Sequence, residues 1–297
     1  MNKKVYQGRG ERLDVFVADI LGISRNKAQN YIKERLVFVN GRAGKPSIIL
    51  EAGDNVEVQD AKDKGLKQVI PKVKIVFENK DIIVIDKDPG IVVYPDSNHK
   101  TGTLLDAVRP KIDIESDERP GVVHRLDKDT SGLIVFAKNS DTERALKREI
   151  KSRKFEKIYL ALVWGHVEPE NGKIEIPIRR SEKDRKKMEA SDTGKDAFTE
   201  YEVVHYYNQS DTGCRISQMT LLKVKIITGR THQIRVHLAA IGYPVVGDKT
   251  YGRRDDRSGL ARQFLHASDL SFKLNGKMYS FHSDLPKYLR IFLEKQE

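Results

Sequence analysis

The amino-acid sequence predicts an α+β protein with two domains: a small N-terminal α/β domain, then a large domain built on a mixed, mainly antiparallel sheet. In the second part of the chain, candidate strands outnumber candidate helices and do not alternate regularly with them, which argues against a Rossmann fold or a barrel. With 297 residues, 38% of them apolar, the chain can bury one large and one small core. We place the domains at residues 1–60 and 73–297, with a charged, weakly periodic linker at 61–72.

The composition indicates a soluble protein with a polyanionic partner. Fifty-four lysines and arginines against 43 aspartates and glutamates give a net charge of +11. This excess favours nucleic acid as the partner, and a merely soluble basic protein is the alternative. The single cysteine, Cys214, excludes an internal disulfide and a cysteine-cluster zinc site. No apolar run approaches the ~20 residues that span a bilayer, and the N-terminus lacks a signal-peptide core, so we expect a cytoplasmic protein that does not bind membranes.

The first domain should contain two helices followed by short strands. Ser24 is a suitable N-cap for the second helix. The run LVFVNGR then alternates like a strand and ends in an Asn-Gly turn, and GDNVEV closes the domain with another strand. Apolar residues at helical spacing predict the first helix, which ends at Gly22; they are Leu13, Phe16, Val17 and Ile20.

Residues 25–45 contain six cations and only one acidic residue, Glu34. A helix and the hairpin after it would present these cations together, which suits a phosphate backbone, although an ordinary solvated helix face is the alternative. The stretch RLDVFVADILGISRNKAQNYIKERLVFVNGRAGKPS, with the closing GDNVEV, also resembles the S4 RNA-binding domain. That resemblance implies RNA as the partner without specifying a reaction. The six cations are Arg25, Lys27, Lys33, Arg35, Arg42 and Lys45.

The second domain begins near Val73 with three expected strands in KIVFENKDIIVIDKDPGIVVYP. A helix in TGTLLDAV would be capped by Thr101 or Thr103, and Ser140 would cap another helix that runs through Ile150. The segments KIYLALVWGHV, AFTEYEVVHYY and QMTLLKVKIIT are further strand candidates. THQIRVHLAAIG has the pattern of a helix with a threonine cap and a glycine stop.

The segment HRLDKDTSG must form a loop between two apolar stretches, GVV and GLIVFAK. This loop places Asp127 at a strand end facing a cleft, where functional side chains concentrate. From the loop alone, a structural ion pair with Arg125 or Lys128 is favoured over a metal ligand or a reactive carboxylate. Metal binding has no supporting motif, since His232 and His237 stand five residues apart on a helix and do not share a face. Phosphate-binding loops and nucleophile motifs are also missing from the sequence, so an enzyme here would need neither a metal nor an organic cofactor.

Five segments within residues 73–295 resemble the pseudouridine synthases of the large ribosomal-subunit type, the RluA/RluD-like group. In chain order they are DKDPGIVVYP, HRLDKDTSGLIVFAK, EKIYLALVWG, IITGRTHQIRVHLAAIGYPVVGDKTYG and FLHASDLSF. The resemblance implies the pseudouridine synthase fold and an isomerase that converts uridine in RNA, above all ribosomal RNA, to pseudouridine. In that reaction the N1–C1′ bond breaks, the uracil turns and C5 joins C1′, which requires no cofactor.

The same resemblance assigns roles to individual residues. Asp127 matches the catalytic aspartate of the family, Tyr159 its active-site tyrosine and Arg235 its active-site arginine. An ionised carboxylate can act as nucleophile or base, a neighbouring arginine favours that ionised form, and a tyrosine ring can stack on uracil. The target base must be flipped out of its helix, and Arg125 then fills the vacated space or pairs with the aspartate or a phosphate.

Three alternative functions remain open at this point. The chain could be a non-catalytic RNA-binding or ribosome-assembly protein, or a uridine isomerase directed to transfer RNA. A carboxylate-based glycosidase would need a second catalytic acid, and none is evident near the motifs. We expect a monomer in each case.

Several other polar residues near the motifs are expected to be structural. For His124 we expect a hydrogen-bonded structural role, and for Tyr251 a place in a turn and the core. His232 and Gln233 should pack in the fold or contact phosphate. The run Arg179–Lys195, with seven basic and four acidic residues, should be an exposed connection that lies against RNA or in solvent.

Overall fold

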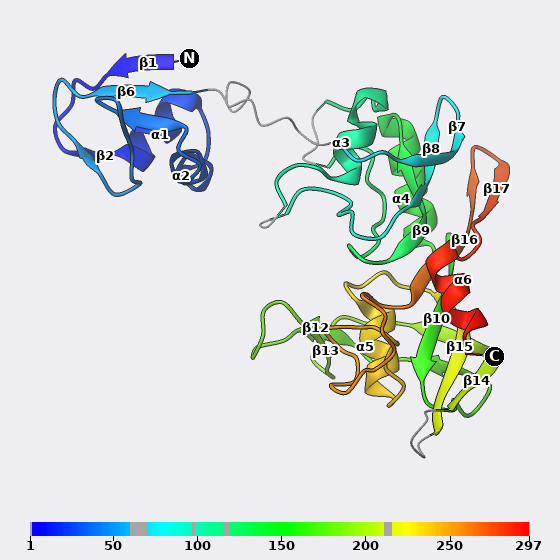
Figure 1. Cartoon of the computed structure of the whole chain (residues 1–297). Coiled ribbons are helices and arrows are strands. Elements are labelled where there is room, and N and C mark those ends of the chain that lie inside the picture. The colour runs from blue at the N-terminus through cyan, green and yellow to red at the C-terminus, as the bar shows by residue number, and fades with distance from the viewer. Residues whose placement is uncertain (1, 60–69, 97–98, 116–118, 211–215, 297) are drawn as a thin grey trace. The chain divides into compact units, whose positions relative to one another are not determined.

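The computed structural model describes residues 2–59, 70–96, 99–115, 119–210 and 216–296 (Figure 1). The chain forms two compact units, residues 1–68 and 69–297. The expected linker lies mostly outside the described residues, and Cys214 lies entirely outside them. In the described part of the chain, no helix is long and apolar enough to cross a membrane.

The first unit combines two helices, α1 (Leu13–Leu21) and α2 (Arg25–Lys33), with short antiparallel strands. One side of each helix joins an apolar cluster with the strands, in which Leu13, Ile32 and Val56 are almost fully buried. Four strands form a sheet in the order β1-β6-β3-β4, and β2 pairs with β5. The strands are β1 (Asn2–Val5), β2 (Glu11–Arg12), β3 (Val37–Val39), β4 (Arg42–Ala43), β5 (Ile49–Leu50) and β6 (Asn55–Val58).

Two of three local signals in the first unit have the expected effects, and the third, the Ser24 cap, is met in position only. Gly22 ends α1 in the left-handed region, with φ of 60°, where a glycine carries no steric penalty. Asn40 and Gly41 turn the chain between β3 and β4 with φ of 50° and 75°. Ser24 occupies the N-cap position of α2, although its side chain makes no capping hydrogen bond.

The expected cations of this unit lie on α2 and on the segment that follows it. Lys27 belongs to α2, but its side chain lies outside the described part of the structure. Five of the six side chains are exposed, so they can contact a ligand from solvent: Arg25, Lys33, Arg35, Arg42 and Lys45.

A nine-stranded mixed sheet forms the centre of the second unit (Figure 1). Its order is β11-β14-β15-β10-β16-β9-β8-β7, with β17 paired to β16. Between the named strands, β16 with β9 is the one parallel pair in the described residues, so the expected mainly antiparallel sheet is confirmed. The strands are β7 (Lys74–Glu78), β8 (Ile82–Lys87), β9 (Ser131–Ala137), β10 (Glu156–Trp164), β11 (Asn171–Ile174), β14 (Thr199–Ser210), β15 (Ile216–Ile226), β16 (Leu265–Leu274) and β17 (Lys277–His282).

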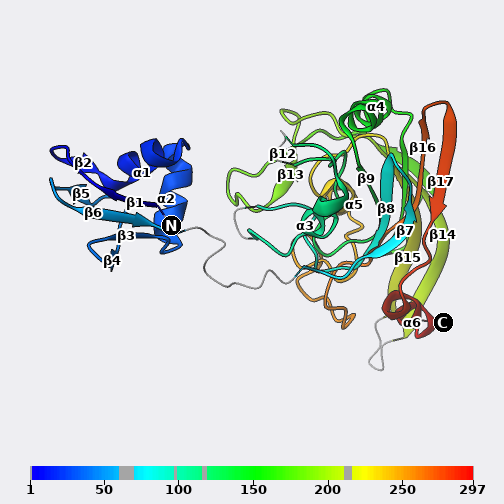
Figure 2. The same cartoon turned by 90° about the horizontal axis from the view of Figure 1, so that it is seen from above.

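Helices cover both faces of this sheet. Successive residues of a strand point to opposite faces, and in the buried strands both sets are apolar, so each face needs a cover. Ile83 and Ile85 join an apolar cluster with α3 and α5, which lie along the same face (Figure 2). Ile82 and Val84 pack on the other face with α4, and Leu162 packs there with α6. The helices are α3 (Leu104–Val108), α4 (Ser140–Lys151), α5 (Gln233–Ala240) and α6 (Lys287–Glu294), with a 3₁₀ turn at Arg109–Lys111.

The third strand expected before α3 is absent from the described structure. Instead, the carbonyls of Val92 and Val93 accept hydrogen bonds from the backbone N–H groups of Leu104 and Leu105. These N–H groups belong to the first turn of α3 and have no partner inside the helix, so the segment docks on the helix rather than on the sheet. Thr103, one of the two expected caps, is the N-cap of α3 and forms a complete capping box with Asp106.

Two helix starts differ from the expectation. The side chain of Asn139, not that of Ser140, caps α4 by accepting from the N–H of Thr142. Thr231 does not cap α5, because the next residue, His232, takes the N-cap position with φ of 56°. The carboxamide oxygen of Gln233 accepts from the N–H of Arg230 and fixes the turn in place of a threonine hydroxyl.

The segment before the HRLDKDTSG loop also differs from the expectation. It forms no strand, and Val122 makes only an isolated bridge to Phe136 of β9. The loop therefore leads into β9 without a preceding strand.

Candidate active site

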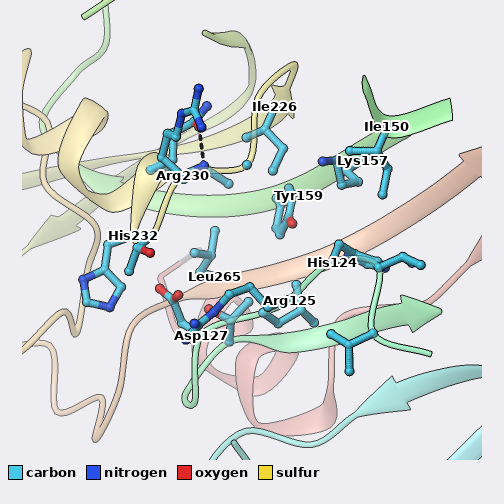
Figure 3. A pocket seen from close by; sticks show the side chains of 18 of the residues that line it. His124, Arg125, Asp127, Ile150, Lys157, Tyr159, Ile226, Arg230, His232 and Leu265 are labelled. Atoms are coloured by element: carbon cyan, nitrogen blue, oxygen red, sulfur yellow. Dashed lines mark hydrogen bonds between the residues drawn. The ribbon is translucent and has the colours of Figure 1, made fainter. Parts of the chain in front are cut away.

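A cavity of about 560 Å³ opens on the face of the sheet that α5 covers (Figure 3). Its walls come from the loop before β9, from β10, from the start of β16, from α4 and from the turn before α5. Asp127, Tyr159 and Arg235 all line it, although 108 residues separate the aspartate from the arginine. The three expected catalytic side chains are thus brought together in a cavity large enough for a nucleoside.

Asp127 reaches the cavity from a loop that is held at both ends. Its own carbonyl accepts from the N–H of Thr130, and the ammonium of Lys87 donates to the carbonyl of Lys128 at 2.9 Å. One carboxylate oxygen of Asp127 accepts from Arg235 at 3.0 Å. The other oxygen has no hydrogen-bond partner among the described residues, and the side chain is 16% exposed. One oxygen is therefore anchored while the other can meet a ligand.

Arg235 is held by a second aspartate that lies deeper in the fold. Its Nε and Nη2 donate to the two carboxylate oxygens of Asp248 at 2.6 and 2.8 Å, and its guanidinium lies 5.1 Å from the ring centre of Tyr251. Burial acts to lower the pKa of Arg235, but the hydrogen bonds with Asp248 and the charge of Asp127 outweigh burial and raise it. Likewise, burial acts to raise the pKa of Asp248, but Arg235 and two backbone N–H groups lower it. Arg235 and Asp248 can therefore both stay charged although they are buried.

Tyr159 sits in the middle of β10, paired with Val224 on β15 and Ala267 on β16. Its side chain is buried, and its ring faces the same cavity as Asp127 (Figure 3). Burial first, and then the negative charge of Asp127, raise the pKa of Tyr159 well above its ordinary value. The phenol therefore stays protonated.

The ion pair favoured from the loop sequence alone is wrong. Asp127 pairs with Arg235, whereas Arg125 donates to the hydroxyl of Tyr94 and lies over its ring, 5.0 Å from the centre. The Lys128 ammonium lies 3.1 Å from a ring nitrogen of His99. Arg125 is exposed at the cavity wall, so this neighbour of Asp127 in the loop remains accessible to a ligand.

Three charged residues of the site were missed in the sequence. Lys87 is 1% exposed and donates to the carbonyls of Asp88, Ile91 and Lys128, which ties the Asp127 loop to the turn after β8. Burial lowers the pKa of Lys87 to about 7. Asp248 and Lys157 are the other two. Each of the three interrupts or flanks an apolar run in the sequence. Asp127 has the same pattern, so this signal could have identified them.

The remaining polar candidates have structural contacts. His124 Nε2 accepts from the N–H of Val135, and burial, aided by the charge of Lys157, lowers the pKa of this histidine to about 3. The carboxamide of Gln233 is buried and donates to the carbonyl of Phe198 at 2.9 Å. These contacts agree with the structural roles expected for both residues.

Tyr251 does more than fill the core, since its hydroxyl lies 2.8 Å from Nδ1 of His232 and accepts from the N–H of Met188. The Met188 contact fixes one strand of the basic run, which forms a hairpin of β12 (Ile178–Arg180) and β13 (Met188–Ala190) rather than an irregular connection. At the hairpin, Arg179 pairs with Glu182 and Glu189.

The histidines of α5 do not form a metal site. His237 is buried, with its ring nitrogens 2.9 Å from the hydroxyl of Thr199 and 2.8 Å from the carbonyl of Ile176. Among the residues that the structure describes, no group of three or more histidine, cysteine, aspartate or glutamate side chains could hold a metal ion.

Comparisons with known proteins agree with this geometry. A family described as "RNA pseudouridylate synthase" matches residues 81–240, and the S4 domain matches residues 11–56. An "Uncharacterized RNA pseudouridine synthase" of Aquifex aeolicus is 43% identical over 254 residues, covering 83% of this chain and 78% of that protein. A "Ribosomal large subunit pseudouridine synthase D" of Pseudomonas aeruginosa is 37% identical and covers 94% of this chain and 89% of its own length.

A solved structure, "Human RNA Pseudouridylate Synthase Domain Containing 1", superimposes with a TM-score of 0.59 at 27% identity. The match covers 72% of this chain and 84% of the human chain. The fold, the cavity and these relatives lead to one conclusion. The chain belongs to the RNA pseudouridylate synthase family and is an isomerase, an RNA pseudouridine synthase with an S4 domain near its N-terminus.

Proposed function

We propose that the protein converts one or more uridines of ribosomal RNA to pseudouridine, and that Asp127 is the reacting group. The observation that carries the proposal is the free carboxylate oxygen of Asp127, which shares a nucleoside-sized cavity with Tyr159 while its other oxygen is held by Arg235. The choice of ribosomal RNA is supported by the name of the Pseudomonas aeruginosa relative. Transfer RNA is the competing target.

The reaction rearranges one nucleoside without adding or removing atoms. The N1–C1′ bond breaks, the uracil turns, C5 bonds to C1′, and the proton on C5 is finally replaced by one on N1. The free oxygen of Asp127 can start this sequence by attacking C1′, by attacking C6 or by removing a sugar proton. Each route uses the carboxylate in its ionised form, and the Arg235 guanidinium holds its other oxygen in place at 3.0 Å.

Tyr159 has two roles in this proposal. Its ring offers a flat apolar surface on which uracil can stack while it turns, and base–aromatic stacking contributes about 1–3 kcal/mol. Its hydroxyl remains protonated because burial and Asp127 raise its pKa, so it can donate a hydrogen bond or relay a proton.

The target uridine must leave its stack to enter the cavity, at a cost of a few kcal/mol. Arg125 is exposed at the cavity wall and lies over the ring of Tyr94. We assign Arg125 the task of occupying the space that the base leaves. A planar guanidinium suits this task because it can stack on the neighbouring bases.

The N-terminal domain, residues 1–60, supplies affinity rather than chemistry, and the linker at 61–72 joins it to the catalytic domain at 73–297. The exposed cations of α2 and the hairpin after it suit contacts with RNA phosphates. The protein acts as a monomer in the cytoplasm, where its RNA is found.

Carbodiimide mapping tests the proposal directly. Ribosomal and transfer RNA are isolated from cells with and without the protein, treated with a carbodiimide and read by reverse transcription for pseudouridine stops. A stop in ribosomal RNA that disappears without the protein, and returns when purified protein acts on the unmodified transcript, is the expected result. A lost stop confined to transfer RNA would overturn the target, and an unchanged pattern in both RNAs would overturn the function.

A further inference from the structure

Lys157 is a buried cation in the cavity with no visible counter-charge. It precedes Tyr159 by two residues on β10, so both side chains face the same side of the strand. Its side chain lines the cavity, the residue is 6% exposed, and its ammonium points into the space beside Tyr159 (Figure 3). Within the described residues, no hydrogen-bond acceptor or carboxylate meets this ammonium, and Nζ lies 5.9 Å from the centre of the Phe155 ring.

The other charges of the cavity are arranged differently. Arg235 is shared by Asp127 and Asp248, and Lys147 forms an ion pair with Glu143. Burial lowers the pKa of Lys157 to about 8, with no carboxylate to oppose it. An ammonium on a largely buried side chain with no acceptor or counter-charge costs free energy, and a ligand that supplies a negative charge would offset that cost.

The position of the ammonium indicates which part of the substrate it meets. A Cβ atom placed on Gly229 would lie 3.8 Å from Nζ of Lys157, so the ammonium lies beside the turn that carries the exposed Arg230. Lys147 and Arg230 also line the cavity, and Figure 3 shows Lys157 and Arg230 on one side of Tyr159 with Asp127 on the other. A nucleotide whose sugar meets Asp127 carries a backbone phosphate on either side of that sugar, and a phosphate is the full negative charge that this side lacks.

We propose that Lys157 is the anion-binding residue of the active site and holds a backbone phosphate that flanks the extruded uridine. The proposal rests on the proposed function, since it takes a uridine in RNA as the substrate. Uracil carbonyl oxygens are the competing ligand of the ammonium. They carry only partial charge, so the two ligands give different responses to salt and to removal of the phosphate charge.

The test combines a lysine variant with a charge-free phosphate. Lys157→Met keeps the length of the side chain and removes the charge, and Lys157→Arg is the matched control that keeps it. The RNA is a hairpin carrying the uridine found by carbodiimide mapping, made with a methylphosphonate at the linkage on its 5′ side, on its 3′ side, or at neither. Initial rates of pseudouridine formation give kcat/KM for each pair of protein and RNA.

For the wild-type protein, one methylphosphonate should lower kcat/KM by about 10- to 100-fold, the range expected when a charge-assisted hydrogen bond is removed. Lys157→Met should show a similar loss on normal RNA and less than about a twofold further loss on that methylphosphonate, because the variant no longer binds this phosphate. Its log–log salt slope for binding should fall by about 0.7 to 0.9, the value for one neutralised phosphate. Lys157→Arg should retain most of the activity.

The proposal would be overturned if, with either methylphosphonate, the reductions in kcat/KM from Lys157→Met and from the RNA change multiplied. An unchanged salt slope of binding in Lys157→Met would also overturn it. A purely structural role is separated by thermal melting without RNA. Replacing an unpartnered buried ammonium by an apolar side chain should leave Tm equal or higher, and a lower Tm would contradict the account. Wild-type protein that forms no pseudouridine in any RNA would instead refute the proposed function, so the two failures are distinguishable.

Discussion

Two aspartates, one in each unit, accept hydrogen bonds from arginine but are left in different states. Asp14 of the N-terminal unit is fully buried and accepts from both Nε and Nη2 of Arg12, from Arg25 and from Gln29, at distances between 2.6 and 3.1 Å. Asp127 of the catalytic unit accepts one hydrogen bond, from Arg235, and keeps one oxygen open to the cavity.

The difference is between an aspartate whose oxygens are all engaged inside the fold and one that leaves an oxygen free for a ligand. Four donors saturate Asp14 and, led by the hydrogen bonds from Arg12, hold its pKa well below the ordinary range despite burial. Asp127 shares its arginine with Asp248, which accepts from Nε and Nη2 of Arg235, whereas Asp127 accepts from Nη1 alone. A carboxylate that is fixed in place with one oxygen free can bind a ligand, whereas a carboxylate with every oxygen engaged can only hold the fold together.

The largest effect short of removing Asp127 itself should come from Asp248→Asn. This change removes the deeper partner of Arg235 and leaves a buried guanidinium with only Asp127 to compensate it. Breaking a buried ion pair from one side costs about 3–5 kcal/mol, and a displaced catalytic group can cost ~100-fold in rate. We expect kcat to fall by at least about 100-fold, together with a lower Tm. Activity within about twofold of wild type would show that Arg235 does not need Asp248.

Tyr159→Phe should have the next largest effect. The ring and its stacking surface remain, but the hydroxyl is removed, and proton transfer by a positioned side chain contributes ~100-fold or more. We expect kcat to fall by about 100-fold, while RNA affinity measured by filter binding stays the same. Tyr159→Leu is the control that removes the ring as well, and it should also weaken binding. Full activity of the Phe variant would restrict Tyr159 to stacking.

Removal of residues 1–68 should act mainly on binding. The exposed cations of α2 and the hairpin after it leave with this unit, and each phosphate that the shortened protein no longer neutralises lowers the log–log salt slope of binding by about 0.7 to 0.9. We expect affinity for ribosomal RNA to fall by about tenfold or more at ~0.1 M salt, with the single-turnover rate at saturating protein retained. An unchanged affinity across a salt series would remove the RNA-binding role from this unit.

The smallest effect on turnover should come from Asp14→Asn, which tests the structural half of the comparison. Because the folded state lowers the pKa of Asp14, its contribution to stability is complete above the unfolded pKa, near ~4, and is lost as pH falls toward the folded value. Calorimetry between about pH 2.5 and 6 should therefore show a steeper acid loss of Tm in the wild type than in the variant. Changed single-turnover rates in the variant would contradict a purely structural role.

Local features of the fold could be predicted from the sequence because they depend on neighbouring residues. The glycine that ends α1, the Asn-Gly turn and the capping box of Thr103 all lie within a few residues of what they stabilise. The prediction of a strand near Val92 was wrong. The carbonyls of this segment bond to the first turn of α3, a dozen residues away, and local sequence does not indicate that partner.

The distances between the site residues along the chain do not predict that these residues meet in the fold. Asp127 and Arg235 meet across 108 residues, and only the resemblance to a family placed them together. The loop sequence favoured Arg125 or Lys128 as the partner of Asp127 because both are near in the chain. The Arg125 guanidinium instead contacts Tyr94, and the Lys128 ammonium lies beside His99. Asp248 was missed because its role depends on the buried Arg235 beside it.

The most direct measurement of the central claim is single-turnover pseudouridine formation by Asp127→Asn, with Asp14→Asn as the matched control. Both changes replace one carboxylate oxygen by an amide nitrogen, and both proteins are used at saturating concentration on the same mapped RNA. The account predicts no detectable product from Asp127→Asn, RNA affinity close to that of the wild type, and a wild-type rate from Asp14→Asn. Product formation by Asp127→Asn at a rate near that of the wild type would contradict it.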